Sequence, residues 1–425
     1  MAGAISLPDR LTKLQDFPAS MTGHGLRHPR VNDGGTALEF DTANVDIINV
    51  EEARSDIRST TRAGYETFDS QPGIQALLDV MPSGSSLHFP SNGIFNLNSK
   101  LITTTQTRQG VVSSGGMGAE LVNGGIALRH SYGRVKNLRL TGASAVGLDI
   151  DAPHASLIDV YNVHIQNKTL ALDVKNVSTY LRFTLLNLFY NTTGTILDYS
   201  GTTGDYGDVF FSQCNWVGNG LGMHWKKVGG VNMIGCKIVN GSLGGLLIES
   251  QNNLATNSPL WGNYIGNCTF EDNANYDLKV SALAGVNVTH YPRRLQIVGG
   301  EVHKLYLDKC YQISLEGVLL PITVNWSSNA SSIMASNCPE LRERLTGSCT
   351  SYIIMGCDGV KDGFIQVGGG FNILDNTRIT GARIGPHITS IASIPAYIGQ
   401  FAVVSGIGYM ATGTGSIADW KQITA

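Results

Sequence analysis

The sequence predicts an all-β chain folded as a right-handed parallel β-helix, a solenoid of short strands, and three observations lead to this fold class. Helical patterns are almost missing, with the best candidate at residues 71–81. Glycine makes up 51 of 425 residues while 42% are hydrophobic and only 15% are charged, which is typical of a folded chain rich in turns. A short pattern also recurs at nearly regular intervals without any helix between its copies.

The recurring pattern is an apolar residue, a polar residue and usually a second apolar residue. The steps between its copies are 24, 25, 26, 25, 30 and 29 residues, and the copies begin at Leu148, Leu172, Leu197, Met223, Ile248, Leu278 and Leu307. A second set of strand-like triplets accompanies it, at Val163–Ile165, Cys214–Trp216, Cys236–Ile238 and Cys268–Phe270. A repeat of this length has room for about three short strands, and only stacked copies bury a continuous core.

The period of two along a strand divides each triplet between the inside and the outside of the solenoid. We expect the seven first residues, and the tryptophans Trp216 and Trp225, to lie inside. The polar residues should then form an outward file with a spacing of about 4.8 Å between strands. This file consists of Asp149, Asp173, Asp198, His224, Glu249, Lys279 and Asp308. In water the repulsion between neighbouring aspartates is only about 1 kcal/mol, so a solvated file is tolerable.

Composition excludes several classes of function. The net charge is −3 and no run of Lys or Arg is present, so we expect no nucleic-acid partner. No stretch reaches the roughly 20 apolar residues of a membrane span, so we expect no membrane insertion. Residues 1–18 lack the apolar core of a secretory signal, which predicts assembly in a cytoplasm. The seven cysteines have no metal spacing, and we expect Cys214, Cys236 and Cys268 to be buried thiols.

The segment after residue 67 carries a family resemblance. Phe68-Asp69-Ser70-Gln71, Ile74–Leu78, Pro82–Pro90 and Gly93–Leu97 follow one another, and Gly115–Gly118 supplies a glycine turn. This order resembles the start of the pectate-lyase-like superfamily as it occurs in bacteriophage tailspikes, and it implies a short N-terminal capping helix. Residues 60–66 depart from the family, because they lack its usual Gly-Asp-Gly-type run.

The C-terminal stretch resembles the short β ending of phage tail proteins, which implies a homotrimer. It comprises Tyr397–Ala402, Gly408–Gly413 and Asp419–Lys421, and the two resemblances together cover about a third of the chain. They imply an N-terminal virion-attachment segment at 1–60, a parallel β-helix at 61–370 and a C-terminal β trimerisation region at 371–425. The implied protein is a receptor-binding tailspike of the virion, attached to a tail or baseplate protein and recognising a bacterial surface polysaccharide.

Glycoside hydrolysis needs two carboxylates at a defined separation, and the outward file offers them. Asp173, Asp198 and Glu249 are the predicted catalytic residues. His224, Asp149 and Trp261, the last in an insertion at 251–263, are the predicted substrate contacts. Glu271 and Glu301, on a second strand with His303, are the alternative catalytic pair.

Two readings of this chemistry stay open. The file can equally be the solvated face that any β-helix has, in which case the protein is a non-catalytic structural or adhesion spike. The polygalacturonase motif Gly-His-Gly occurs only at 23–25, before the coils, and no acidic cluster has a suitably placed outward Arg for a calcium-dependent lyase. We therefore expect no metal and no cofactor. The missing signal disfavours a bacterial enzyme that modifies cell walls.

Overall fold

The structure is a computed structural model, and it describes most of the chain between residues 67 and 355. The gaps in that range are 104–108, 114–117, 152–155, 176–178, 199–207, 251–260, 328, 340, 342–344 and 348–351. Outside it, the described residues are 28–31, 38–41, 47–53, 57, 59, 391, 401–404, 407–413 and 415–422. The chain forms two compact units, residues 1–219 and 220–425, which are described separately.

The first unit is a stack of coils whose strands pair in parallel in three sheets. The first sheet runs through β3 (Ile47–Asn49), β4 (Ser86–Phe89), β7 (Gly110–Ser113), β10 (Arg134–Thr141), β12 (Ser156–Gln166), β14 (Thr179–Thr184) and β17 (Val209–Ser212). The second uses β5 (Ile94–Asn96), β8 (Glu120–Val122), the later halves of β10 and β12, β15 (Asn187–Phe189) and β18 (Asn215–Val217). The third contains β6 (Leu101–Ile102), β9 (Ile126–Leu128), β11 (Val146–Asp151), β13 (Leu170–Lys175) and β16 (Thr193–Asp198).

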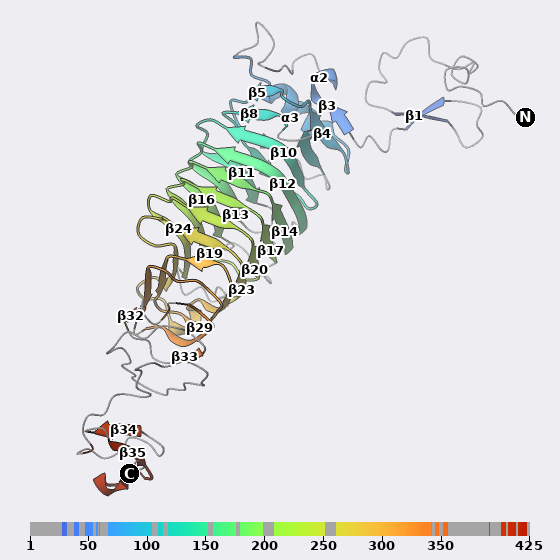
Figure 1. Cartoon of the computed structure of the whole chain (residues 1–425). Helices are drawn as coiled ribbons and strands as arrows, with labels where there is room; N and C mark the ends of the chain where they lie inside the picture. Colours follow the sequence, from blue (N-terminus) through green and yellow to red (C-terminus); the bar gives the residue numbers. More distant parts are fainter. Residues whose placement is uncertain are drawn as a thin grey trace, which may run out of the picture. The chain divides into compact units, whose positions relative to one another are not determined.

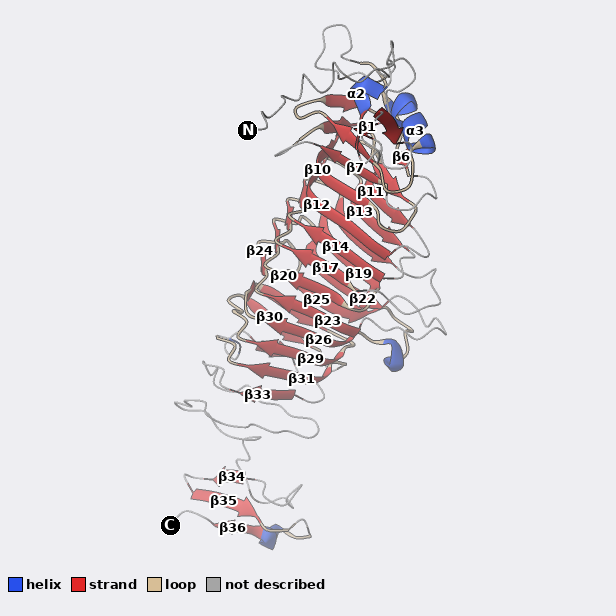
Figure 2. Ribbon diagram, turned by 90° about the vertical axis from the view of Figure 1, so that its right-hand side faces the viewer, coloured by secondary structure: helices blue, strands red, loops and turns tan. Residues whose placement is uncertain are grey.

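The second unit repeats this arrangement, and Figure 2 shows the strands of its first sheet following one another. That sheet contains β20 (Val231–Ile234), β23 (Trp261–Gly266), β26 (Arg293–Val298), β29 (Tyr311–Glu316), β31 (Ser331–Ser336) and β33 (Tyr352–Met355). The second contains β21 (Lys237–Val239), β24 (Thr269–Glu271) and β27 (Glu301–Val302). The third contains β19 (Leu221–Lys227), β22 (Gly244–Ser250), β25 (Leu278–Ala282), β28 (Lys304–Leu307), β30 (Thr323–Trp326) and β32 (Leu345–Gly347). Three parallel sheets in both units confirm the predicted parallel β-helix.

The core confirms the predicted inward residues and corrects their register. All seven are buried, as are Trp216, Trp225 and the thiols of Cys214, Cys236 and Cys268. They do not form one column, however. Leu148 pairs with Leu172, but Leu197 pairs with Val174, two residues further along. A shift of two residues keeps every side chain on the same side of a strand, so the sequence pattern could not detect it.

In four successive coils, a single residue with a left-handed backbone forms the bend between the first and second sheets. In the first unit these residues are Asn137 (φ 56°), Asn162 (φ 51°), Leu185 (φ 55°) and Gln213 (φ 53°). Asn tolerates this conformation better than most residues do. The Asn162 amide also donates to the Asn137 Oδ1 at 2.9 Å, and such bonds from coil to coil fix the bend.

A buried lysine ties neighbouring coils of the first unit together. Lys168 is almost fully buried, and its ammonium donates to the carbonyls of Gly124 (2.9 Å) and Thr141 (2.5 Å) and to the hydroxyl of Ser144 (2.7 Å). Burial lowers the pKa of Lys168 to about 8. The cage supplies the three acceptors that a buried ammonium requires.

Helix α3 (Gln71–Val80) matches the predicted helix within one residue and buries Ile74, Leu77 and Leu78. Its Gln75 hydrogen-bonds both the backbone N–H and the carbonyl of Ile102 in β6, each at 2.8 Å. The helix thus lies against an early coil, while its role as a cap stays a prediction. Shorter helical turns among the described residues include α2 (Val50–Ala53), η1 (Val288–His290) and η2 (Ile417–Asp419).

Antiparallel strands occur near both ends of the chain. β1 (His28–Val31) pairs with β2 (Leu38–Asp41), and β34 (Phe401–Val404), β35 (Ile407–Ala411) and β36 (Trp420–Gln422) form the predicted C-terminal β region. Trp420 is buried with Ala411 and packs against Ile391 and Tyr409. The boundaries at 60 and 370 stay predictions, although β3 already pairs with β4. No helix in the described part of the chain is long and apolar enough to span a membrane.

Candidate functional site

The third sheet of the first unit brings two aspartates together at matching positions. Asp149 in β11 pairs in register with Asp173 in β13, as the sequence predicted. Neighbouring strands are about 4.8 Å apart, so the two side chains start from backbone positions separated by a similar distance. Both side chains are nearly buried, with 8% and 6% of their surface exposed, which corrects the expectation of a solvated file.

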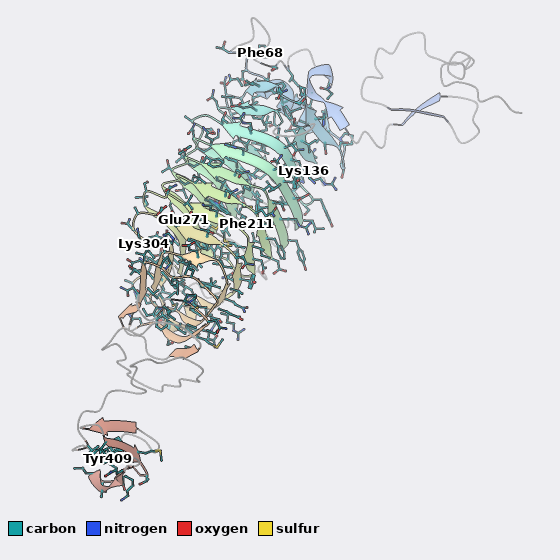
Figure 3. The ribbon with its side chains drawn as sticks, in the orientation of Figure 1. Phe68, Lys136, Phe211, Glu271, Lys304 and Tyr409 are labelled. Carbon is teal, nitrogen blue, oxygen red and sulfur yellow. The ribbon has the colours of Figure 1, made fainter. Side chains whose placement is uncertain are left out.

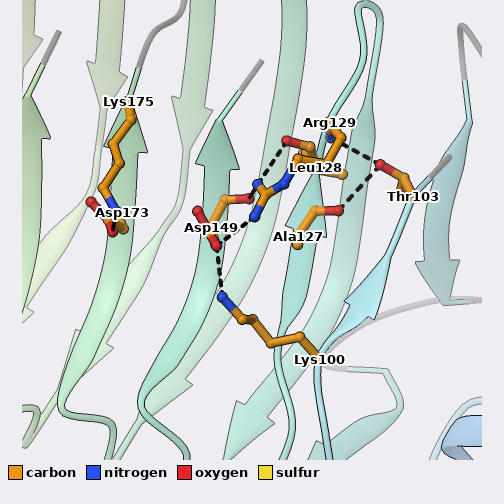
Figure 4. A network of polar contacts seen from close by, with 8 residues as sticks. All are labelled: Lys100, Thr103, Ala127, Leu128, Arg129, Asp149, Asp173 and Lys175. Atoms are coloured by element: carbon orange, nitrogen blue, oxygen red, sulfur yellow. Dashed lines mark hydrogen bonds and ion pairs between the residues drawn. The ribbon is translucent and has the colours of Figure 1, made fainter. Parts of the chain in front are cut away.

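Three cations hold the two carboxylates, as Figure 4 shows. The Asp149 Oδ2 accepts hydrogen bonds from the Lys100 ammonium and the Arg129 guanidinium, both at 2.7 Å. The Lys175 ammonium lies 2.5 Å from the Asp173 Oδ2. The Oδ1 atoms of both aspartates are buried and accept no hydrogen bond from any described residue. The Arg129 guanidinium is thus ion-paired to Asp149.

The two environments shift the pKa values in opposite directions. Burial raises the pKa of Asp149, but the hydrogen bonds and charges of Arg129 and Lys100 outweigh it and lower the pKa overall. Burial also raises the pKa of Asp173, and there the bond to Lys175 is too weak to reverse the shift, while the charges of Asp149 and Asp198 add to it. A proton therefore resides more readily on Asp173 than on Asp149.

Asp198 does not continue the file as predicted. It pairs in register with Lys175, and Ile196 occupies the position beside Asp173. The cause is the same two-residue shift that displaces Leu197. Asp198 stays close enough for its charge to raise the pKa of Asp173, so it influences the pair without being in line with it.

Glu249 and His224 lie together in the second unit. The His224 Nε2 is 3.7 Å from the Glu249 Oε2, and the Ser281 hydroxyl donates to the Glu249 Oε1 at 3.4 Å. The register differs from the predicted one here too, because His224 pairs with Leu247. The two side chains are therefore diagonal neighbours on the outer face of the sheet.

The alternative pair, Glu271 and Glu301, gathers with His303 on the second sheet of the same unit. One potential ligand atom of each residue lies within 4.8 Å of the other two. The Lys237 ammonium contacts the Glu271 Oε1 at 2.6 Å. Lys304, labelled with Glu271 in Figure 3, donates to the carbonyls of Asn273 and Ala274.

Three further residues belong to this comparison with the sequence, namely Trp261, Lys100 and Arg129. Trp261 begins β23, where its backbone pairs with Arg293, but its side chain and most of the insertion at 251–260 lie outside the described residues. Sequence reasoning missed Lys100, which precedes β6, and Arg129, which follows β9. Neither belongs to the repeated triplet, so only the stacking of coils places them at Asp149.

Opposite pKa shifts predict opposite effects of two matched variants on stability. Asp149→Asn should lower the free energy of unfolding at pH 7 by about 2 kcal/mol, because Lys100 and Arg129 lose the carboxylate that they share. Asp173→Asn should leave it unchanged or raise it, because a buried carboxylate with a raised pKa opposes folding when it ionises. Urea denaturation measures both values.

The pH dependence of the same variants has a definite sign. The folded pKa of Asp149 lies below its ordinary value of 3.8, so its stabilisation is complete above pH 3.8 and is lost as the pH falls through the folded pKa. The folded pKa of Asp173 lies above its ordinary value of 3.8. Its contribution to the free energy of unfolding is therefore fully present below pH 3.8 and is lost as the pH rises through the folded pKa. Equal destabilisation by the two variants at pH 7 would contradict this assignment.

Comparison with solved structures identifies the fold. The sequence matches no protein-family model and no curated protein. The A-module of the mannuronan C-5 epimerase AlgE4 of Azotobacter vinelandii is similar with a TM-score of 0.53 at 12% identity, over 79% of this chain and 100% of that module. The Dettilon tailspike protein gives 0.47 at 11% identity, over 87% and 77%. The tailspike of E. coli bacteriophage HK620, in complex with a pentasaccharide, gives 0.45 at 9%, over 83% of each chain. The chain is therefore a parallel β-helix protein, and the likeness to the epimerase module supports the fold that its three parallel sheets show.

Proposed function

We propose that this protein is a receptor-binding tailspike that recognises a bacterial surface polysaccharide and hydrolyses it with Asp149 and Asp173. The observation that carries the proposal is the pair of neighbouring carboxylates with opposite pKa shifts. A glycosidase needs one carboxyl group that is protonated and another that is ionised, and it obtains them by giving two similar residues different surroundings. Asp173 supplies the acid and Asp149 supplies the anion.

The separation of the carboxylates favours a mechanism that retains the anomeric configuration. Retaining enzymes hold the two groups about 5–5.5 Å apart, close to the spacing of adjacent strands. Asp173 gives its proton to the glycosidic oxygen while Asp149 bonds to the anomeric carbon and the glycosidic bond breaks. The product of this step is an ester between Asp149 and the sugar. Water then attacks the anomeric carbon of the ester, Asp173 takes up a proton of the water, and Asp149 is released as a carboxylate.

Access to the pair requires Lys175 to move. Its side chain is 45% exposed and its ammonium lies beside Asp173 (Figure 4), so a bound sugar can take its place without disturbing the core. Lys100 and Arg129 stay on Asp149 and keep it ionised. The same cations would also contact polar groups of a bound glycan.

The second candidate function is a binding spike without turnover. It is favoured by the burial of both carboxylates and by the three cations that already neutralise them. A structural ion cluster of this kind needs no substrate. The two functions differ in one measurable product, the new reducing end that each cleavage releases.

The decisive experiment incubates the purified full chain with capsular or O-antigen polysaccharide and measures reducing ends over time. We expect their number to increase with the enzyme concentration and the product to retain its anomeric configuration when followed by NMR. Binding without new reducing ends, on glycans that the protein demonstrably retains, would leave the binding spike as the function.

Assembly and location belong to the same proposal. We propose a homotrimer joined through residues 371–425, with residues 1–60 attached to a tail or baseplate protein of the virion. The apolar side chains of Ile407, Met410 and Ile417 support it, because they are 37%, 41% and 50% exposed at the C-terminal sheet. Contact with neighbouring subunits would remove this apolar surface from water.

A further inference from the structure

We propose that Glu271, Glu301 and His303 form a binding site for a divalent transition-metal ion such as Zn²⁺. The three side chains offer two carboxylate oxygens and one imidazole nitrogen within 4.8 Å of one another. This inference does not depend on the proposed hydrolytic pair, whose residues lie in the other unit of the chain.

The backbone fixes the positions from which the three ligands start. Thr269 pairs in register with Glu301, and the His303 N–H donates to the Phe270 carbonyl at 3.1 Å, so Glu271 and His303 are neighbours across two strands. Glu301 and His303 are two residues apart and therefore project from the same face. Both strands belong to a parallel sheet, which makes them rigid supports for a site.

The distances suit a small ion after side-chain rotation alone. Zinc binds nitrogen and oxygen at about 2.0–2.2 Å, which places tetrahedral ligands about 3.3 Å apart. The His303 Nε2 already lies 2.8 Å from the Glu301 Oε1, so this pair faces a common point. Glu271 has to approach by an ångström or so, and it is only partly buried. The fourth position would be left to water.

The charges around the site favour a cation. Two carboxylates lie near each other here, and the Lys237 ammonium contacts one of them, at 2.6 Å from the Glu271 Oε1. The Lys237 side chain is 46% exposed, so it can leave that oxygen at little cost. A dication in the centre would neutralise both carboxylates at once. The Lys237 ammonium therefore competes with the metal ion for the Glu271 carboxylate.

The donor set distinguishes among metals. Calcium prefers six to eight oxygen ligands, whereas an imidazole with two carboxylates suits zinc and its neighbours in the first transition row. The expectation of no metal rested on the ligand pattern of calcium-dependent lyases. The ligand set here differs from that pattern, because it combines oxygen and nitrogen atoms and comes from two separate strands.

Calorimetric titration of the full chain with ZnCl₂ tests the site. We expect one strong site in the wild type and at least a tenfold loss of affinity in His303→Asn, Glu271→Gln and Glu301→Gln. Lys237→Met should increase the affinity severalfold, because it removes the competing ammonium. His224→Asn is the matched control, since it alters another histidine beside a glutamate, at 3.7 Å, and should leave the affinity unchanged.

Each alternative outcome overturns the proposal in its own way. Absence of zinc binding in both the wild type and Lys237→Met would show that the cluster holds no metal. Zinc binding that survives all three ligand substitutions would place the ion elsewhere, for example on a cysteine. Tighter binding of Ca²⁺ than of Zn²⁺ would refute the choice of metal. Melting curves of every variant without metal verify that the fold is intact.

Discussion

Asp149→Asn and Asp173→Asn are each expected to lower polysaccharide cleavage at least hundredfold while glycan binding persists. Both substitutions keep the shape of the side chain and remove its charge, and acid, base and nucleophilic groups typically contribute factors of 10²–10⁴ or more. The measurement is the rate of appearance of reducing ends at a temperature well below the melting point of Asp149→Asn. Binding is measured separately with the same polysaccharide.

The two variants should differ with activated substrates. Asp173→Asn removes the acid, so a leaving group that needs no proton, such as a nitrophenolate, should restore much of the first step. Asp149→Asn removes the nucleophile, so it should stay inactive with the same substrate. Added azide should restore some turnover to Asp149→Ala, in which the shortened side chain leaves room for it beside the anomeric carbon. The reverse pattern would exchange the two roles.

Asp159→Asn is the control for this experiment. Asp159 lies in the first sheet of the same unit and forms an ion pair with Lys136 at 2.7 Å, half exposed to solvent. It therefore resembles the proposed pair in chemistry but not in burial or in its neighbours. Full activity in Asp159→Asn together with full activity in Asp173→Asn would eliminate the pair as the active site.

The sequence predicted the inside and outside of the coils well because this property depends only on the period of two. Every predicted core residue from Leu148 to Leu307 is buried, and the polar residue after each of them projects from the opposite side of its strand. The period of two does not determine which residues of neighbouring strands pair with each other. Leu172 and Val174 are both apolar and both inward, so a partner such as Leu197 fits either of them. The length of the loop between the strands determines which of the two pairs with Leu197, and loop length follows no repeating pattern.

The same ambiguity explains how much of the candidate site was predicted. Asp149 and Asp173 follow from the repeat, and so do Glu271, Glu301 and His303 as outward neighbours. Asp198 does not, because the shift moves it beside Lys175. Burial of Asp149 was missed for a different reason. It depends on Lys100 and Arg129, which stand outside the triplets and reach Asp149 only after the coils stack.

Leu197→Asp is expected to prevent folding of the first unit. Leu197 is fully buried in β16 beside Val174. Removing its side chain alone typically costs 2–5 kcal/mol, and an unpaired carboxylate among apolar groups adds several more. Their sum approaches the whole stability of an ordinary domain, about 5–15 kcal/mol. Circular dichroism and limited proteolysis of the purified chain measure the loss.

Asp198, the residue after Leu197, provides the control because it lies in the same strand and projects from the opposite face. Asp198→Ser should cost less than about 1 kcal/mol, as is usual for a partly exposed charged residue. Leu197→Met, which conserves volume and polarity, should cost less than about 1.5 kcal/mol. A folded Leu197→Asp variant with a melting temperature near that of the wild type would mean that the side chain can turn to solvent. Since its neighbours Ile196 and Asp198 point the other way, such a turn requires β16 to leave the sheet, and the parallel β-helix would then be wrong at this coil.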